Sequence, residues 1–140
     1  QLQKALPGLT ITLKVEPKKQ RVQDMQDGNF QLGLTRWGPD YADPMTYLGM
    51  WVTDNSNNYG LWSNSDYDKI IAECTTGKLA TDTQGRWDRL YDAEKIVMDD
   101  AVIFPLYTQC NAEMVSSKVT GIEYHPVALN RVYKDAVKSE

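Results

Sequence analysis

The segment from Trp37 to Pro44 holds the side chains with the clearest potential for chemistry. Within eight residues it contains two aromatic residues, two carboxylates and two prolines. Pro39 and Pro44 fix their own backbone φ angles, so Asp40 between them is held at a defined angle. A carboxylate beside aromatic faces can bind an ammonium group through charge-assisted hydrogen bonds and cation–π contact. The pattern therefore makes Asp40 a candidate for binding a positively charged amine.

Two other interpretations of the same segment remain open. Asp40 and Asp43 are of a residue type that caps turns, and Trp37 can belong to a hydrophobic core, in which case the segment is structural. Paired carboxylates beside aromatic platforms also occur in enzymes that hydrolyse sugars, with one carboxyl group as acid and the other as base or nucleophile. Patterning alone does not decide between binding, structure and catalysis.

Other motifs that could carry chemistry are incomplete. Residues 54–58 are similar to the start of an EF-hand calcium loop, but Tyr59 stands at the place of the sixth-position glycine and Ser65 at that of the bidentate glutamate. His125 is the only histidine and precedes a proline, which favours a surface position over catalysis. Neither a phosphate-binding loop nor a nucleophile elbow occurs. These motifs therefore support no catalytic triad, and we expect neither a metal nor a cofactor.

The composition narrows the function classes further. The 140 residues include 15 Lys and Arg against 19 Asp and Glu, and a net charge of -4 lacks the attraction that nucleic-acid binding needs. The longest apolar run, Val102–Tyr107, is far shorter than the ~20 residues of a transmembrane helix. Four Trp and eight Tyr favour a recognition surface, because these side chains combine an apolar face with a polar group. Cys74 and Cys110 are expected to be buried thiols, and whether they pair stays open.

Alternating apolar residues predict two strands in the first part of the chain. Leu9–Val15 and Phe30–Thr35 have the period of a strand with one buried face. A short helix is expected at Val22–Asp27, and a helical tail at Leu2–Leu6 without a visible start indicates that the chain continues a longer unit. This alternation of helix and strand is typical of a mostly parallel α/β sheet, in which ligands bind beyond the carboxyl ends of strands. Trp37–Pro44 directly follows the second strand.

Two amphipathic helices are expected in the middle of the chain. The first starts with Ser65 as its N-cap and runs for about three turns, and the second covers Asp82–Asp99. Further strands are predicted at Val102–Tyr107, where Pro105 indicates an edge or a bulge, and at Ala112–Val115. The residues expected to face the core are Tyr67, Ile70, Ile71 and Cys74 in the first helix and Trp87, Leu90, Tyr91, Val97 and Met98 in the second.

Several motifs occur in series along the chain: FQLGLTRWGPDYADP at residues 30–44, the helical sequences SDYDKII and RLYDAEKIVMDD, and the strand VIFPLY. Together they closely resemble the C-terminal part of bacterial oligopeptide-binding proteins of peptide ABC transporters, which are extracellular solute-binding proteins of family 5. The resemblance implies part of a two-lobed periplasmic-binding-protein type II fold, α/β in class, with a mixed, mostly parallel sheet flanked by helices. Such proteins are several times longer. Residues 1–110 would then belong to the larger C-terminal lobe, and residues 111–140 would return towards the other lobe.

The resemblance also implies ligand-binding residues. Asp40 matches the position whose carboxylate receives the α-ammonium of the peptide, and Trp37 matches a residue that lines a side-chain pocket. The main chain of Arg36 to Gly38 matches a stretch that pairs with the ligand backbone as an added strand. Tyr41 belongs to the same W-x-x-D-Y motif and is assigned to the same site. Main-chain pairing does not depend on the ligand's sequence, so broad specificity is expected.

Two positions depart from the family pattern. Some peptide binders have an Arg three positions before the Trp that can meet the carboxylate of the ligand, and this position is Leu34 here. On the strand that ends at Tyr107, a second aromatic residue of some relatives is replaced by Gln109. Tyr107 and Gln109 are both included among the expected ligand-binding residues.

The implied function is the capture of oligopeptides outside the cytoplasm and their delivery to the membrane permease of an ABC transporter, without enzyme activity. The implied location is the periplasm, or a lipid anchor on the outer face of the cytoplasmic membrane. We expect a monomer that binds peptide and no nucleic acid. The alternatives are a relative tuned to dipeptides, nickel chelates, sugars or a signalling peptide and, more remotely, a carbohydrate-active enzyme that uses Asp40 and Asp43.

Overall fold

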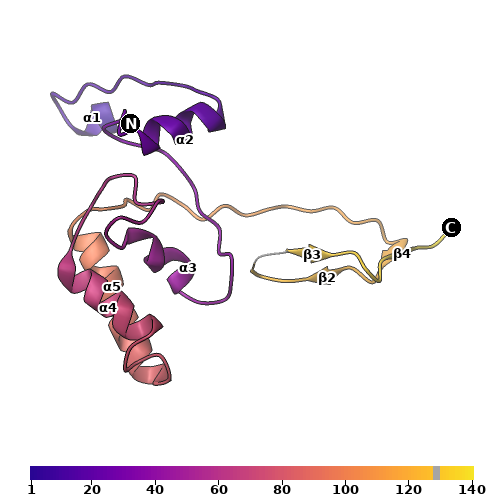
Figure 1. Ribbon diagram of the computed structural model, residues 1–140. Helices are drawn as coiled ribbons and strands as arrows, with labels where there is room; N and C mark the ends of the chain where they lie inside the picture. The colour runs from indigo at the N-terminus through magenta and orange to yellow at the C-terminus, as the bar shows by residue number, and fades with distance from the viewer. Residues whose placement is uncertain (128–129) are drawn as a thin grey trace. The chain divides into compact units, whose positions relative to one another are not determined.

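The computed structural model describes residues 1–127 and 130–140 and divides the chain into two units, residues 1–33 and residues 34–140. The first unit contains α1 (Leu2–Ala5) and α2 (Lys18–Gln26), which an extended segment joins (Figure 1). Both helices were expected from the sequence, and α2 starts directly after Pro17, before the predicted Val22.

The strand predicted at Leu9–Val15 is wrong for this structure. The segment is extended but pairs with no strand among the described residues, and Leu13 and Val15 are exposed. A strand needs a neighbour that accepts its backbone hydrogen bonds, and period-two patterning says nothing about where that neighbour is. The segment is instead linked to α2 through the Lys14 side chain, which binds the buried carboxylate of Asp24.

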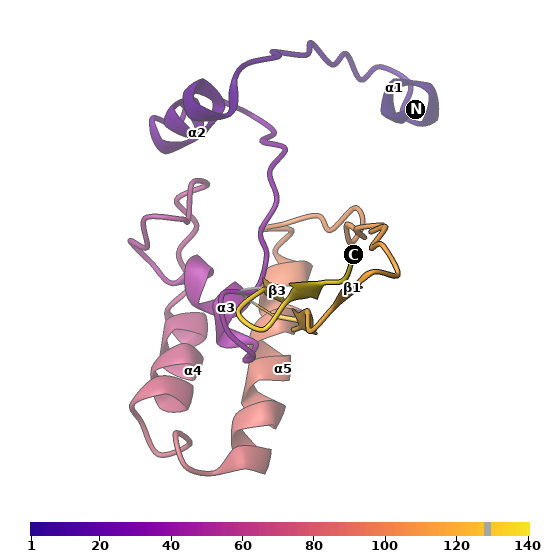
Figure 2. The ribbon, with the colours of Figure 1, turned by 90° about the vertical axis from the view of Figure 1, so that its right-hand side faces the viewer.

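The second unit is built around two helices that lie side by side, α4 (Ser65–Thr75) and α5 (Thr83–Asp99), as Figures 1 and 2 show. Each begins at a side-chain cap. The Asn64 carboxamide accepts the backbone N–H of Asp66 and Tyr67 at 3.0 and 3.1 Å, and Asp82 accepts that of Gly85 at 3.0 Å. Both predicted helices are therefore confirmed, with Asn64 rather than Ser65 as the cap of the first.

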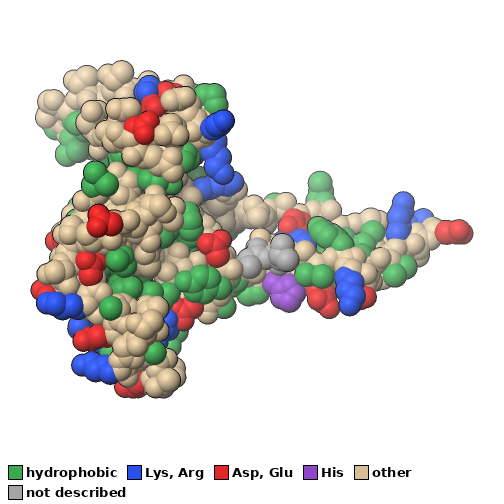
Figure 3. Space-filling view, in the orientation of Figure 1, with side chains coloured by type: hydrophobic (Ala, Val, Ile, Leu, Met, Phe, Trp, Pro, Cys, Tyr) green, Lys and Arg blue, Asp and Glu red, His purple; other side chains and the backbone are tan. Residues whose placement is uncertain are grey.

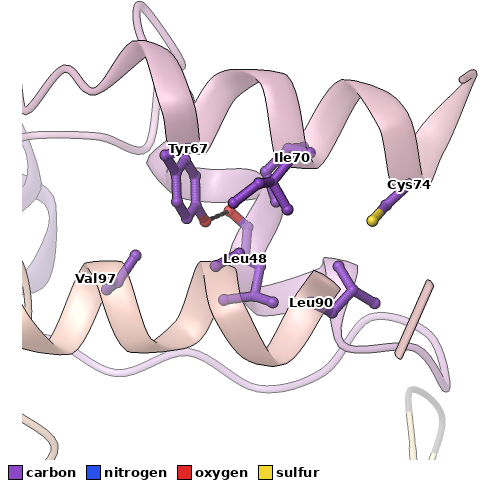
Figure 4. Close-up of a cluster of buried hydrophobic side chains, with 8 residues drawn as sticks. Leu48, Tyr67, Ile70, Cys74, Leu90 and Val97 are labelled. Atoms are coloured by element: carbon purple, nitrogen blue, oxygen red, sulfur yellow. Dashed lines mark hydrogen bonds between the residues drawn. The ribbon is translucent and has the colours of Figure 1, made fainter. Parts of the chain in front are cut away.

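The short helix α3 (Met45–Leu48) and the 3-10 helix η1 (Gly49–Trp51) pack against this pair. Tyr67 of α4 is fully buried, and its hydroxyl group donates to the carbonyl of Leu48, as Figure 4 shows. Burial raises the pKa of Tyr67 far above its usual range, so the hydroxyl remains a donor. The buried cluster consists of Leu48, Tyr67, Ile70, Ile71, Cys74, Leu90, Ala93 and Val97.

The inner face of α5 is narrower than the sequence predicts. Leu90 and Val97 are buried as expected, together with Ala93, which the pattern did not single out. Trp87 is 51% exposed and Tyr91 70% exposed, and Met98 is exposed as well, so their predicted core positions are wrong. Positions 90, 93 and 97 follow the i, i+3, i+7 seam of a helix that contacts one neighbour, and side chains beside that seam remain in water.

The mostly parallel sheet is also wrong for the described residues. They form two small antiparallel pairs, β1 (Val119–Thr120) with β4 (Val137–Lys138) and β2 (Glu123–Tyr124) with β3 (Arg131–Val132). The strands predicted at 30–35, 102–107 and 112–115 pair with no described strand, and hydrophobic side chains reach the surface in both units (Figure 3). No helix in the described ranges is long and apolar enough to cross a membrane.

Candidate ligand-anchoring loop

Residues 36–44, here called the anchor loop, run without regular secondary structure up to the start of α3. Trp37 is 43% exposed and Tyr41 is 51% exposed, and Asp40 between them is exposed as well. The interpretation of Trp37 as a core residue is therefore wrong. A Cβ atom on Gly38 would meet nothing within 4 Å, so the backbone at this position is open to a partner. The loop thus offers an acidic and aromatic surface with accessible main chain.

The main chain of Asp40 is fixed although its side chain is free. The Asp40 backbone N–H donates to Thr46 Oγ1 at 2.9 Å, and Thr46 in α3 is only 5% exposed. Among the described residues, none donates a hydrogen bond to the Asp40 carboxylate. A carboxylate on an anchored backbone with free acceptor atoms can receive an ammonium group without first breaking an internal bond.

Asp43 has a different environment from Asp40. Its carboxylate receives both terminal nitrogens of Arg86 from α5, at 2.7 and 2.8 Å, and the backbone N–H of Met45 at 2.9 Å. The Arg86 Nε donates to the carbonyl of Cys74 at 2.9 Å. This capping role agrees with the structural interpretation of Asp43. Hydrogen bonds from Arg86 lower the pKa of Asp43, whereas a general acid needs a raised one, which disfavours Asp43 as the acid of a glycosidase.

The Arg86–Asp43 pair makes stability depend on acid pH. Because the pKa of Asp43 in the folded protein lies below its ordinary 3.8, the stabilisation is complete above that value and is lost as the pH falls through the lower folded-state pKa. We expect Asp43→Asn to reduce the free energy of unfolding by about 2 kcal/mol at neutral pH. The difference from the wild type should shrink below pH 3.8. Urea titrations of both proteins across this range measure it, and a difference independent of pH would contradict the expectation.

Two predicted ligand-binding residues that are far apart in the sequence meet in the structure. Arg36 Nη1 donates to Gln109 Oε1 at 2.6 Å, which joins the anchor loop to the extended segment after α5. Tyr107 on that segment is exposed, and none of the described hydrogen bonds or ion pairs links it to the anchor loop. The structure therefore brings Gln109 to the loop directly and leaves the role of Tyr107 as a prediction.

Two residues that support the loop were not singled out from the sequence. Thr46 follows Pro44 at the start of a helix, and its hydroxyl group gave no signal beyond that of an ordinary helix residue. Arg86 lies outside the apolar stripe that the helical pattern predicts for residues 82–99, and its partner Asp43 lies 43 positions earlier. Pairing across such a separation depends on how α3, α4 and α5 pack, and helical periodicity carries no information about it.

The remaining candidate side chains are those of the two cysteines and the histidine. Cys74 is buried as expected and burial raises the pKa of its thiol, whereas Cys110 is exposed, so the expectation of burial is wrong for it. Both are free thiols. His125 is exposed, as predicted. No group of three or more potential metal ligands occurs in the part of the chain that the structure describes.

The chain is similar to known proteins in both sequence and structure. No protein-family model matches the chain. The dipeptide-binding protein of Lactococcus lactis subsp. cremoris is 37% identical over 134 residues, which are 96% of this chain and 24% of the relative. The substrate-binding domain of an oligopeptide ABC transporter from Bacillus anthracis matches with a TM-score of 0.86 and 34% identity, over 99% of this chain and 27% of its own. Listeria monocytogenes OppA bound to peptide matches with a TM-score of 0.82 and 38% identity, over 100% of this chain and 26% of its own.

The chain therefore spans about a quarter of the length of these relatives. Other relatives that it matches are named periplasmic oligopeptide-binding or murein peptide-binding proteins. The structural neighbours are type II periplasmic-binding-protein domains, which supports the fold that the motifs implied. Over nearly its whole length, the chain is thus homologous to a portion of the peptide-binding proteins of ABC transporters.

Proposed function

We propose that this chain is the ligand-anchoring portion of a two-lobed oligopeptide-binding protein that serves an ABC transporter. The observation that carries the proposal is the Asp40 carboxylate, which is exposed, unpaired among the described residues and mounted on a fixed backbone between exposed aromatic side chains. In this proposal Asp40 receives the α-ammonium of the peptide, and Trp37 lines a side-chain pocket. The homology to peptide-binding proteins supports this choice of ligand.

Main-chain recognition completes the proposed site. The backbone from Arg36 to Gly38 pairs with the peptide as an added strand, and the open surroundings of Gly38 support this role. Tyr41, Tyr107 and Gln109 are assigned to the same site, and the bond between Gln109 and Arg36 supports the assignment of Gln109. Main-chain pairing gives affinity for any peptide sequence, so we expect broad specificity.

The remaining parts of the proposal concern the whole protein. Residues 1–110 belong to the larger lobe, and residues 111–140 return towards the other lobe. The protein is a monomer, lies outside the cytoplasm in the periplasm or on a lipid anchor, and delivers its ligand to a membrane permease. The periplasmic relatives support the location. It carries out no chemistry, in line with the binding function of its relatives.

A dipeptide is the second candidate ligand, because a relative of 37% identity is named a dipeptide-binding protein. Recognition of the peptide's carboxyl end would distinguish the two ligands, since a dipeptide has both termini near the anchor loop. Calorimetry of the full-length protein with unmodified peptides of increasing length, and with the same peptides amidated at the C-terminus, separates the two. Binding confined to unmodified dipeptides would replace oligopeptides by dipeptides in the proposal.

The proposed two-lobed mechanism predicts that the 140 residues alone are a poor binder. Lobe closure is a hinge motion stabilised by ligand contacts to both lobes, and one portion of the protein cannot provide it. We expect the isolated chain to bind peptides more weakly than micromolar, while the full-length protein binds the same peptides tightly. Isothermal titration calorimetry of both proteins measures this. Micromolar or tighter binding by the isolated chain would contradict the need for closure.

A further inference from the structure

The guanidinium of Arg86 lies at a junction of three elements. Its Nε bonds to the last turn of α4 through the carbonyl of Cys74, at 2.9 Å, and its two terminal nitrogens bond to the anchor loop through the carboxylate of Asp43. The Arg86 and Asp43 side chains are only 19% and 29% exposed. Since the planar fork of arginine matches a carboxylate at two points, the pair fixes both the distance and the orientation of the loop relative to α5.

Two further hydrogen bonds connect this junction to Asp40 through Thr46. The Asp43 carbonyl accepts the backbone N–H of Thr46 at 3.1 Å, and the buried Thr46 hydroxyl accepts the backbone N–H of Asp40 at 2.9 Å. Residues 40–44 belong to no helix or strand, and one further backbone bond in this stretch joins the Asp43 N–H to the Tyr41 carbonyl at 2.9 Å. The orientation of the Asp40 backbone therefore depends on a short series of bonds from α5 through Asp43 and Thr46.

We propose that Arg86 is a positioning residue for the Asp40 ammonium site: its fork on Asp43 sets the direction of the Asp40 carboxylate without Arg86 contacting the ligand. This inference rests on the proposed peptide-binding function. The position of the Arg86 guanidinium matters for the Asp40 site more than its charge does, because that charge is already compensated by the Asp43 carboxylate at 2.7 Å. A lysine at this position would keep the charge but could not bridge both Asp43 oxygens and the Cys74 carbonyl in one plane.

The test compares two peptides that differ only at the amino end. In the full-length protein, Arg86→Lys is expected to weaken binding of a free-amine tripeptide about tenfold, because one charge-assisted contact of the ligand loses its alignment. Binding of the N-acetylated tripeptide should change less than twofold, since it makes no bond of this kind. Arg89→Lys is the matched control, because Arg89 lies on the same helix and pairs with Asp92 rather than with the anchor loop.

A double-mutant cycle separates positioning from a general loss of structure. In an Asp40→Ala background, Arg86→Lys should cause no further loss of free-amine binding, because the group that it positions is gone. Equal losses for the two tripeptides, or additive losses in the cycle, would overturn the inference, since a merely destabilised loop affects both ligands. A wild-type affinity for Arg86→Lys would overturn it as well.

A second variant covers the case in which Arg86→Lys does not fold, as judged by circular dichroism. Thr46→Val removes the acceptor for the Asp40 N–H and should reproduce the selective loss, while Thr46→Ser, which keeps the hydroxyl group, should restore binding. If Thr46→Val binds the free-amine tripeptide as tightly as the wild type does, the proposed series of bonds from Arg86 to Asp40 would be wrong. Two other results would show instead that the proposed function is wrong. The wild type would bind no peptide, or Asp40→Ala would weaken binding of both tripeptides equally. In either case the inference about Arg86 would be wrong as well.

Discussion

Asp40→Ala in the full-length protein is expected to weaken the binding of free-amine peptides by about a hundredfold, because the peptide ammonium loses its charged, hydrogen-bonded partner inside a closed site. The side chain is exposed in this chain and no described residue hydrogen-bonds its carboxylate, so its removal should not unfold the loop. The backbone bond from Asp40 to Thr46 is unaffected by the substitution. The loss of affinity should therefore reflect the missing contact with the ligand and not a less stable protein.

Peptides acetylated at the amino end provide the decisive comparison for this variant. They carry no ammonium group, so Asp40→Ala should change their affinity only slightly. Calorimetric titration of wild type and variant with both forms of one tripeptide measures the selectivity. Asp66→Ala, which removes an exposed carboxylate from α4, controls for the change in net charge and should leave both affinities unchanged. Equal losses for the two forms in Asp40→Ala would remove Asp40 from the ammonium role.

Leu90→Ala is expected to have the largest effect on stability, a loss of about 2 to 5 kcal/mol in the free energy of unfolding, because it leaves a cavity where α5 packs on α4. Leu90 is 2% exposed and belongs to the buried cluster with Tyr67 and Val97 (Figure 4). The buried cluster has eight members, so truncating Leu90 removes a substantial share of its packing.

The neighbouring residue is a matched control for this prediction. Tyr91→Ala removes a larger side chain from the next position of the same helix, but Tyr91 is 70% exposed, so we expect a change within about 0.5 kcal/mol. Urea unfolding of the 140-residue chain, followed by the far-ultraviolet circular dichroism of α4 and α5, measures both variants. If Tyr91→Ala reduced the free energy of unfolding more than Leu90→Ala does, the wider buried face of α5 that periodicity alone predicts would be correct.

The pair of central helices could be predicted from the sequence because the information for them is local. Tyr67, Ile70, Ile71 and Cys74 repeat with helical spacing, and cap residues stand at the start of each helix. The anchor loop could also be predicted, since prolines, carboxylates and aromatic residues cluster within a few positions. The motif series pointed to peptide-binding proteins, and the comparisons confirm that homology.

Only the tertiary structure decided which faces and partners these elements have. Period-two patterning in 9–15 and 30–35 marks segments able to form strands, but a strand exists only where a neighbour accepts its hydrogen bonds, and the described residues supply none. The pairs Arg86–Asp43 and Arg36–Gln109 join residues 43 and 73 positions apart. Such pairs form when packed helices bring distant segments within hydrogen-bond distance, so local sequence determined the elements and packing determined which of their side chains hold the anchor loop in place.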